Sequence, residues 1–217
     1  MTSERRKCLV VGAGGQSRAV LSILQEPANR DKFEVIGILD LAYQGVPEEV
    51  LGLAVIGSLE DLAEFRGKAC SLFLAIGDNL KRSEVFLGAE AHGFHFPNLI
   101  SQHALISASA TLQPGNIVCP NAYIGPYVKL GSNNLLNTKS IVEHEAVVGS
   151  HCHVAPAAII CGRVTIGNFT MVGAGAIITD NKKIASKTII GAGSVVGKDI
   201  DVEGGTYVGL PARHIKR

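Results

Sequence analysis

The chain has 217 residues, a net charge of +1 and a charged fraction of 18%. This balance leaves no basic stripe for nucleic acid, and no run of eighteen apolar residues predicts a membrane span. The polar start (MTSERRKC) carries no signal-peptide pattern, and the five cysteines lack CxxC pairs, so we expect reduced thiols in a cytoplasmic protein.

The first hundred residues alternate between short apolar runs and helical patterns. We expect strands at 7–11, 34–39 and 72–76, and helices at 18–25, 59–65 and 81–92. The second helix opens on a capping-box sequence, Ser58-Leu59-Glu60-Asp61. Strands that alternate with helices predict a small parallel sheet, so residues 1–99 are expected to form an α/β domain with a Rossmann-like parallel sheet.

A glycine-rich turn, Gly12-Ala13-Gly14-Gly15-Gln16-Ser17, lies between the first strand and the first helix. A diphosphate would meet backbone N–H groups and a helix N-terminus there, and Asp40 ends the second strand where a ribose or base would be read. Ser17 stands where the dinucleotide motif has its third glycine, so a tight turn without a ligand is the alternative. A domain this short favours one nucleotide-sized ligand over a full NAD site.

From Ile106 to Val208, every sixth residue is aliphatic. Ile100 extends the series backwards, and the residue two positions earlier is mostly small. A strict six-residue period predicts a parallel β-helix with three flat faces in each eighteen-residue coil, so residues 100–217 form the second expected domain. Six coils without an insertion fit residues 106–213. The eighteen hexad positions are Ile106, Leu112, Val118, Ile124, Leu130, Leu136, Val142, Val148, Val154, Ile160, Ile166, Val172, Ile178, Ile184, Ile190, Val196, Val202 and Val208.

The hexad residues and the small residues are expected to point into the narrow prism. Asn134 and Lys182 are exceptions at the inward small positions. A buried lysine without a partner is costly, so we expect the coil around residues 180–183 to bulge.

Among seven histidines, His144 is flanked by Glu143 and Glu145 and is expected to face outward. A carboxylate neighbour suits a general base, although a solvated surface histidine is the equal alternative. His153 lies half a coil later on another face, so the two could share a pocket only between subunits. A cyclic homotrimer with sites between subunits is the natural closed assembly. A metal site at His151-Cys152-His153 is disfavoured because Cys152 is expected to point inward, and we expect no metal.

Six segments carry a resemblance that spans the whole chain: VVGAGGQSR at 10–18, ILD at 38–40, FLAIGDN at 73–79, LNTKSIVEHEAVVG at 136–149, HVA at 153–155 and VGLPAR at 208–213. They resemble the hexapeptide-repeat sugar acetyltransferases of the NeuD/PglD-like family. The resemblance implies an all-β left-handed parallel β-helix after the α/β domain. It also implies acetyl-CoA-dependent N-acetyl transfer to the 4-amino group of a UDP- or GDP-linked 4-amino-4,6-dideoxy sugar.

The resemblance also implies residue roles. His144 would be the general base, Glu145 would tune it, and Asn137 would lie near the reacting amine. The expected acetyl-CoA contacts are His153, Gly162, Ala174 and Ala192, and the expected nucleotide-sugar contacts are Gly14, Gly15, Gln16, Asp40, Leu41 and Gly77. Gln16 replaces a common histidine and Leu41 replaces a second acid found in some members, and both changes bear on which nucleotide or sugar is held.

Three other functions remain open from the sequence. O-acetylation of a sialic-acid-like sugar is the nearest rival, because the nucleophile cannot be read from the residues. A non-catalytic β-helix scaffold and a redox enzyme that uses the glycine-rich turn are the more distant ones. The sequence names neither the sugar nor the nucleotide base.

Overall fold

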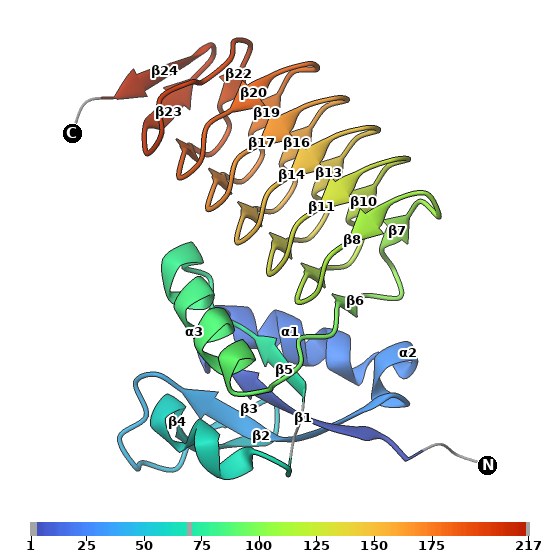
Figure 1. The fold of residues 1–217 in the computed structure, drawn as a ribbon, viewed down its shortest axis with the longest axis vertical. Helices are drawn as coiled ribbons and strands as arrows, with labels where there is room; N and C mark the ends of the chain where they lie inside the picture. The colour runs from blue at the N-terminus through green and yellow to red at the C-terminus, as the bar shows by residue number, and fades with distance from the viewer. Residues whose placement is uncertain (1–3, 69–70, 216–217) are drawn as a thin grey trace. The chain divides into compact units, whose positions relative to one another are not determined.

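The computed structural model describes residues 4–68 and 71–215, in which the chain forms two compact units that divide between Gln102 and His103 (Figure 1). Cys70 and the first three residues of the polar start, on which sequence expectations also rested, lie outside the described residues. Each unit is described here by itself.

The first unit contains a five-stranded sheet in the order β3-β4-β2-β1-β5. Strands β1 (Arg6–Val11), β2 (Phe33–Asp40), β4 (Leu53–Ser58) and β5 (Ser71–Leu74) are parallel, and the short β3 (Glu49–Val50) pairs antiparallel with β4. The central strand β1 has β2 on one side and β5 on the other, so the strand order reverses beside β1. Ligands of open α/β sheets collect at such a switch point.

Helices α1 (Gly15–Gln25), α2 (Pro27–Arg30) and α3 (Asn79–Ala91) and the 3₁₀ helix η1 (Leu59–Phe65) connect these strands. The expected alternation of strands and helices is confirmed, and α2, β3 and β4 are additions to it. The capping box is present, because the side chains of Ser58 and Asp61 each accept a hydrogen bond from the other residue's backbone N–H, but it opens a 3₁₀ helix. The short strand β6 (Leu99–Ile100) ends this unit.

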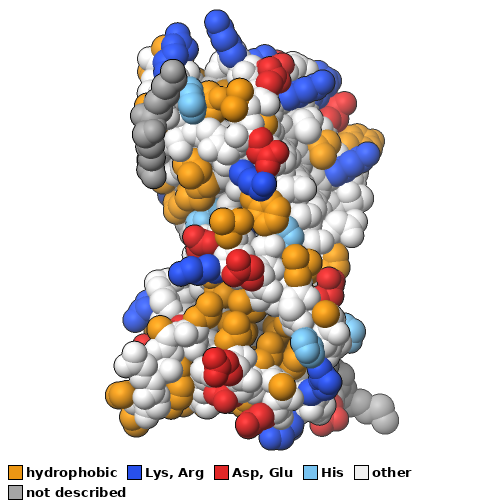
Figure 2. All heavy atoms as spheres, turned by 60° about the vertical axis from the view of Figure 1, so that its left-hand side comes forward, with side chains coloured by type: hydrophobic (Ala, Val, Ile, Leu, Met, Phe, Trp, Pro, Cys, Tyr) orange, Lys and Arg blue, Asp and Glu red, His pale blue; other side chains and the backbone are white. Residues whose placement is uncertain are grey.

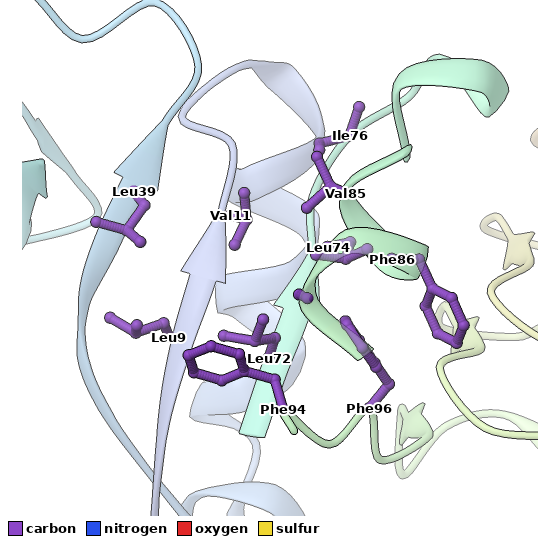
Figure 3. Packing of buried hydrophobic residues seen from close by; sticks show 11 residues of the cluster. Leu9, Val11, Leu39, Leu72, Leu74, Ile76, Val85, Phe86, Phe94 and Phe96 are labelled. Carbon is purple, nitrogen blue, oxygen red and sulfur yellow. The ribbon is translucent and has the colours of Figure 1, made fainter. Parts of the chain in front are cut away.

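Alternate residues of β1 point to opposite faces of the sheet, as the pleat requires. Leu9 and Val11 join Leu72 and Leu74 of β5 in a buried cluster that Val85 and further residues of α3 complete. Figure 3 shows these side chains between the strands and α3, while α1 crosses behind the strands. The cluster fixes α3 against the sheet and thereby sets the position of the loop after β5.

The second unit is a parallel β-helix of two-residue strands, one for each hexad (Figure 1). Strands eighteen residues apart pair in parallel, as Ile141 does with Ile159, so each of three faces is one stacked sheet. The first face holds β7 (Leu105–Ile106), β10 (Tyr123–Ile124), β13 (Ile141–Val142), β16 (Ile159–Ile160), β19 (Ile177–Ile178) and β22 (Val195–Val196). The second holds β8 (Thr111–Leu112), β11 (Lys129–Leu130), β14 (Val147–Val148), β17 (Thr165–Ile166) and β20 (Lys183–Ile184). The third holds β9 (Ile117–Val118), β12 (Leu135–Leu136), β15 (His153–Val154), β18 (Met171–Val172), β21 (Ile189–Ile190) and β23 (Thr206–Gly209).

Each corner between two faces requires one residue in the left-handed region of backbone space. Glycine adopts this conformation without cost, but most corners here carry other residues. Glu145 has a φ of 61° and Arg163 a φ of 60°, and these two corner residues lie one coil apart. The corners therefore carry charged side chains, such as those of Glu145 and Arg163, at a small conformational cost.

The hexad register holds from Ile106 to Val196 and then changes. Ile200 bridges to Ile184 and Tyr207 pairs with Ile190, which are spacings of sixteen and seventeen residues instead of eighteen. Val202 is 62% exposed, so it does not fill an inward position. The expectation of six uninterrupted coils is therefore wrong for the last one. That coil shortens and ends in an antiparallel hairpin of β23 and β24 (Ala212–Ile215).

The bulge expected around residues 180–183 is also wrong. Lys183 pairs with Thr165 in the regular register, and Lys182 is half-buried beside it. The irregular segment begins only at Gly197, one coil later. There the Lys183 N–H finds the Asp199 side chain as its acceptor, at 3.0 Å.

Asn134, the other inward exception, is fully buried and fully engaged. Its amide donates to Asn116 Oδ1 at 3.0 Å and to the Gly131 carbonyl at 2.9 Å, and its oxygen accepts the Cys152 N–H at 2.6 Å. Asn116, Asn134 and Cys152 are eighteen residues apart, so these bonds link three successive coils. A ladder of polar contacts thus runs along the inside of this corner.

We expect Asn134→Ala to lower the free energy of unfolding by about 2 to 4 kcal/mol, because it removes three buried hydrogen bonds. Urea unfolding would measure the change. Thr111→Ala, on an exposed strand position of the same unit, is the control and should change stability by less than about 0.5 kcal/mol. Equal effects of the two substitutions would contradict a stabilising ladder.

Candidate active site

His144 and Glu145 form the corner that follows β13. His144 Nδ1 lies 3.1 Å from Glu145 Oε2, and both side chains are about half exposed. A carboxylate can only accept hydrogen bonds, so this contact assigns the proton of the neutral imidazole to Nδ1 and leaves the lone pair on Nε2. The hydrogen bond from His144 and then that from Arg163 hold the pKa of Glu145 below its usual value. The corner therefore presents an oriented base.

Gly162 lies one coil beyond His144 and supports the imidazole ring. A Cβ at position 162 would lie 2.6 Å from both Cε1 and Nε2 of His144, so only glycine lets the ring rest against the backbone there. The Gly162 N–H has no acceptor among the described residues. Gly162 is one of the expected acetyl-CoA contacts, and in the structure it lies against the expected base.

Arg163 completes this corner, and the sequence analysis missed it. Its Nη2 lies 3.0 Å from the same Glu145 oxygen that His144 engages, and its backbone N–H donates to the His144 carbonyl at 3.0 Å. The eighteen-residue spacing between Glu145 and Arg163 was the available signal, because residues one coil apart stack. We call His144, Glu145, Gly162 and Arg163 the His144 edge.

A second edge of the prism holds the remaining expected residues of this unit. Asn137 follows β12 and His153 opens the neighbouring strand β15, and Asn137 Nδ2 lies 3.4 Å from His153 Nε2. Ala174 and Ala192 occupy the same corner one and two coils further on and are exposed. We call these four residues the Asn137 edge. The first face of the prism separates the two edges, so one chain does not bring His144 and His153 together.

The glycine-rich turn leads directly into α1. Gly14 is the N-cap of α1, and Gly14 and Gly15 are exposed with open space beside them. Gln16 is half-buried and its Nε2 is buried without a hydrogen-bond partner. The turn thus offers free backbone N–H groups and one unused amide donor at a helix N-terminus.

Asp40 holds the loops around this turn. Its Oδ2 accepts the Ala13 N–H at 2.5 Å and its Oδ1 accepts the Ala42 N–H at 2.8 Å. The carboxylate expected to read a ribose or base therefore already joins the turn after β1 to the loop after β2. Any ligand contact of Asp40 would use the lone pairs that these bonds leave.

A buried arginine fixes the loop that contains Gly77. Arg82 of α3 is fully buried, and its guanidinium donates to the Ile76 carbonyl at 3.0 Å and to Asn79 Oδ1 at 2.8 Å. Gly77 is exposed and lies just beyond β5, while the glycine-rich turn lies beyond β1. Both loops leave the carboxyl ends of neighbouring strands, at the switch point of the sheet.

A cavity of about 400 Å³ opens between η1 and α3 in the first unit. Leu41 is the one expected substrate residue that lines it, and the others lie outside its lining. The lining is mostly apolar, with charged groups at Glu60, Lys81 and Glu84. The cavity thus begins beside the loop that Asp40 fixes.

The His151-Cys152-His153 segment holds its side chains apart. His151 contacts Asn133 Nδ2 at 2.8 Å and stacks on Phe169 with ring centroids 5.0 Å apart, while Cys152 is fully buried. Within residues 4–68 and 71–215, no group of three His, Cys, Asp or Glu side chains could hold a metal ion. The same residues contain no helix long and apolar enough to cross a membrane.

Comparison with known proteins follows the same division of the chain. Residues 7–87 match the model of the PglD N-terminal domain. A mutant of perosamine N-acetyltransferase from Caulobacter crescentus, solved with CoA and GDP-perosamine, is 30% identical, with 97% of each chain covered and a TM-score of 0.91. The acetyltransferase domain of PglB from Neisseria gonorrhoeae FA1090, solved with acetyl coenzyme A, is 29% identical and has a TM-score of 0.88, with 98% of this chain and 100% of that chain covered.

A third structure, WeeI from Acinetobacter baumannii AYE, is similar in fold. It is 23% identical with a TM-score of 0.83 and covers 97% of this chain and 100% of that chain. The expected fold, an α/β domain followed by a left-handed β-helix, is confirmed.

We expect Gly162→Ala to displace the His144 imidazole without unfolding the chain, because the new Cβ would overlap Cε1 and Nε2. A crystal structure of the variant would show the ring turned away from position 162. Gly197→Ala is the matched control, since a Cβ there meets no atom within 4 Å. An unmoved ring in Gly162→Ala would contradict the close packing.

Proposed function

The chain belongs to the PglD-like family of sugar N-acetyltransferases, and we propose that its acceptor is the 4-amino group of a nucleotide-linked 4-amino-4,6-dideoxy sugar. Acetyl-CoA is the acyl donor. The observation that carries this proposal is the His144 edge, where Glu145 orients the imidazole so that Nε2 is free to accept a proton. The nucleotide is UDP or GDP, and we place the enzyme in the cytoplasm, where reduced cysteines fit.

In the proposed reaction the neutral sugar amine attacks the thioester carbonyl of acetyl-CoA. As the C–N bond forms, His144 Nε2 takes a proton from the nitrogen, and the negative charge develops on the carbonyl oxygen. The tetrahedral intermediate then collapses, the C–S bond breaks, and the imidazolium returns the proton to the thiolate. The products are the N-acetylated sugar and CoA, and His144 ends in its starting form.

Gly162 has a second part in this proposal. Its unused N–H lies on the coil that supports the imidazole, so it could donate to the developing oxyanion. A fixed backbone donor in a site shielded from water stabilises such a charge without reorganisation. The same glycine would then hold the base and stabilise the charge.

The Asn137 edge would bind acetyl-CoA, and a neighbouring subunit would supply it. Small exposed residues at Ala174 and Ala192 leave room for a thin pantetheine arm against the backbone. Since one prism keeps His153 away from His144, we propose that the Asn137 edge of one subunit and the His144 edge of the next form each site.

The outward side chains of the three faces favour such an assembly. The outward residues of the second face include Lys129, Thr165 and Lys183, whereas those of the other two faces are mostly apolar. In the upper part of Figure 2 apolar side chains reach the surface of this unit among charged ones. A closed trimer needs two different contact faces on each subunit, and two apolar faces beside one polar face meet that need. The outward residues of the first face are Leu105, Tyr123, Ile141, Ile159, Ile177 and Val195, and those of the third face that remain accessible are His153, Met171 and Ile189, because Ile117 and Leu135 are already buried within the chain.

The first unit would bind the nucleotide. Free N–H groups at Gly14 and Gly15 suit a diphosphate at the start of α1, and Gln16 offers a further donor. Asp40, Leu41 and Gly77 lie on the adjoining loops. Binding energy from the nucleotide would then fix the small sugar for reaction, which raises turnover as well as affinity.

We expect Ile159→Glu, on the first face, to break the trimer, because it places a charge in an apolar contact. Light scattering after gel filtration would measure the mass. Thr165→Glu on the second face is the control and should remain trimeric. A wild-type protein that runs as a monomer at micromolar concentration would remove the basis for sites between subunits.

We expect His144→Gln to lower acetyl transfer by about 10² to 10⁴-fold, as for loss of a general base. Release of CoA and the mass of the product would be measured with a panel of UDP- and GDP-linked amino sugars. Undiminished turnover of the variant would contradict the role of His144. A product that loses its acetyl group in mild base would instead identify O-acetylation.

A further inference from the structure

Arg163 is a corner residue whose side chain the proposed reaction does not yet use. Its guanidinium and the His144 imidazole engage the same oxygen, Glu145 Oε2, at 3.0 and 3.1 Å. Glu145 thus has one fixed position between a permanent cation and the expected base. The Arg163 side chain is 58% exposed, and an exposed ion pair adds little to the free energy of unfolding.

The backbone fixes this geometry independently of the side chains. The Arg163 N–H donates to the His144 carbonyl at 3.0 Å, and the Glu145 N–H donates to the Pro126 carbonyl at 2.8 Å. Glu145 and Arg163 occupy equivalent left-handed corner positions on adjacent coils, so their side chains leave the prism at the same edge. A substitution of the Arg163 side chain therefore leaves the corner itself in place.

We infer that Arg163 is a positioning residue for the proposed transferase reaction, which it serves by fixing the Glu145 carboxylate that orients the His144 imidazole. This inference rests on the function proposed above. Without Arg163, Glu145 would gain rotational freedom. The base would then be less well oriented toward the substrate amine.

The other charged groups around His144 do not reproduce this effect. Glu143 Oε2 accepts a hydrogen bond from the His144 backbone N–H at 3.4 Å, so this carboxylate contacts the backbone of His144. Asp180 occupies the same corner two coils beyond His144. The Cys161 thiol is kept protonated, because burial and then the charges of Asp180 and Glu143 raise its pKa. Among these described groups only Arg163 is a cation, so it alone offsets the negative charge of the Glu143, Glu145 and Asp180 carboxylates.

The pKa of Glu145 determines the direction in which loss of Arg163 shifts the pH dependence of activity. Its hydrogen bonds to His144 and Arg163 lower its pKa, so it stays ionised as the pH falls, down to that lowered pKa. Removal of Arg163 moves the pKa of Glu145 back toward its usual value. The carboxylate then becomes protonated, and ceases to orient His144, at a higher pH. This change moves the acid limb of the activity profile to higher pH.

The test compares Arg163→Gln with Arg163→Lys and with Lys187→Gln. Lys187 is the matched control, because it is a corner residue with a φ of 57°, is 56% exposed and pairs with Glu203 at 2.7 Å. We expect Arg163→Gln to lower kcat/KM about tenfold at neutral pH and to move the acid limb up by about half a pH unit. Arg163→Lys should restore the position of the limb, and Lys187→Gln should match wild type.

Two outcomes would overturn the inference: an Arg163→Gln profile that superimposes on wild type, or one whose acid limb moves to lower pH. NMR titration of the His144 imidazole, assigned with His144→Gln, gives a readout without substrate. If wild type transfers no acetyl group, the proposed function fails, while the titration still decides whether Arg163 governs His144. An unchanged titration in Arg163→Gln would sink the inference even in an active enzyme.

Discussion

The pairing of each coil with the next at a spacing of eighteen residues is the constraint on which the second unit depends. Parallel backbone hydrogen bonds hold this spacing from Leu105 to Val196. Since every residue then stacks on the one eighteen positions away, local chemistry is built in columns that run along the prism. The imidazole of His144 against Gly162 and the pair of Glu145 and Arg163 are both products of adjacent coils.

The strict period made this architecture predictable from the sequence. It also gave the outward direction of His144 and the separation of His144 from His153. It failed at Val202 and Val208, because aliphatic residues continue the pattern where the backbone has already shortened its coil. It failed again at Lys182, because a half-buried lysine can keep its head group in water without distorting the strand beside it.

The contacts of the site were less predictable than its location. Sequence spacing placed Asp40 at a strand end, but it could not show that Ala13 and Ala42 already occupy the carboxylate. Arg163 lies outside the sequence motif around His144, because its partner Glu145 is one coil away along the chain. Asn134 looked like an exception in the sequence, yet it is satisfied by contacts that only the folded chain provides, and the buried Arg82 is satisfied in the same way.

The stacking of His144 on Gly162 also limits how such a chain can change in length. Each coil contacts only the coils beside it, so removal or addition of whole eighteen-residue units beyond Arg163 would leave this corner intact. A gain or loss of even one residue between positions 145 and 162 would instead bring a different side chain under the imidazole. Insertions and deletions in this half of the protein are therefore tolerated in multiples of eighteen residues, which is one complete coil.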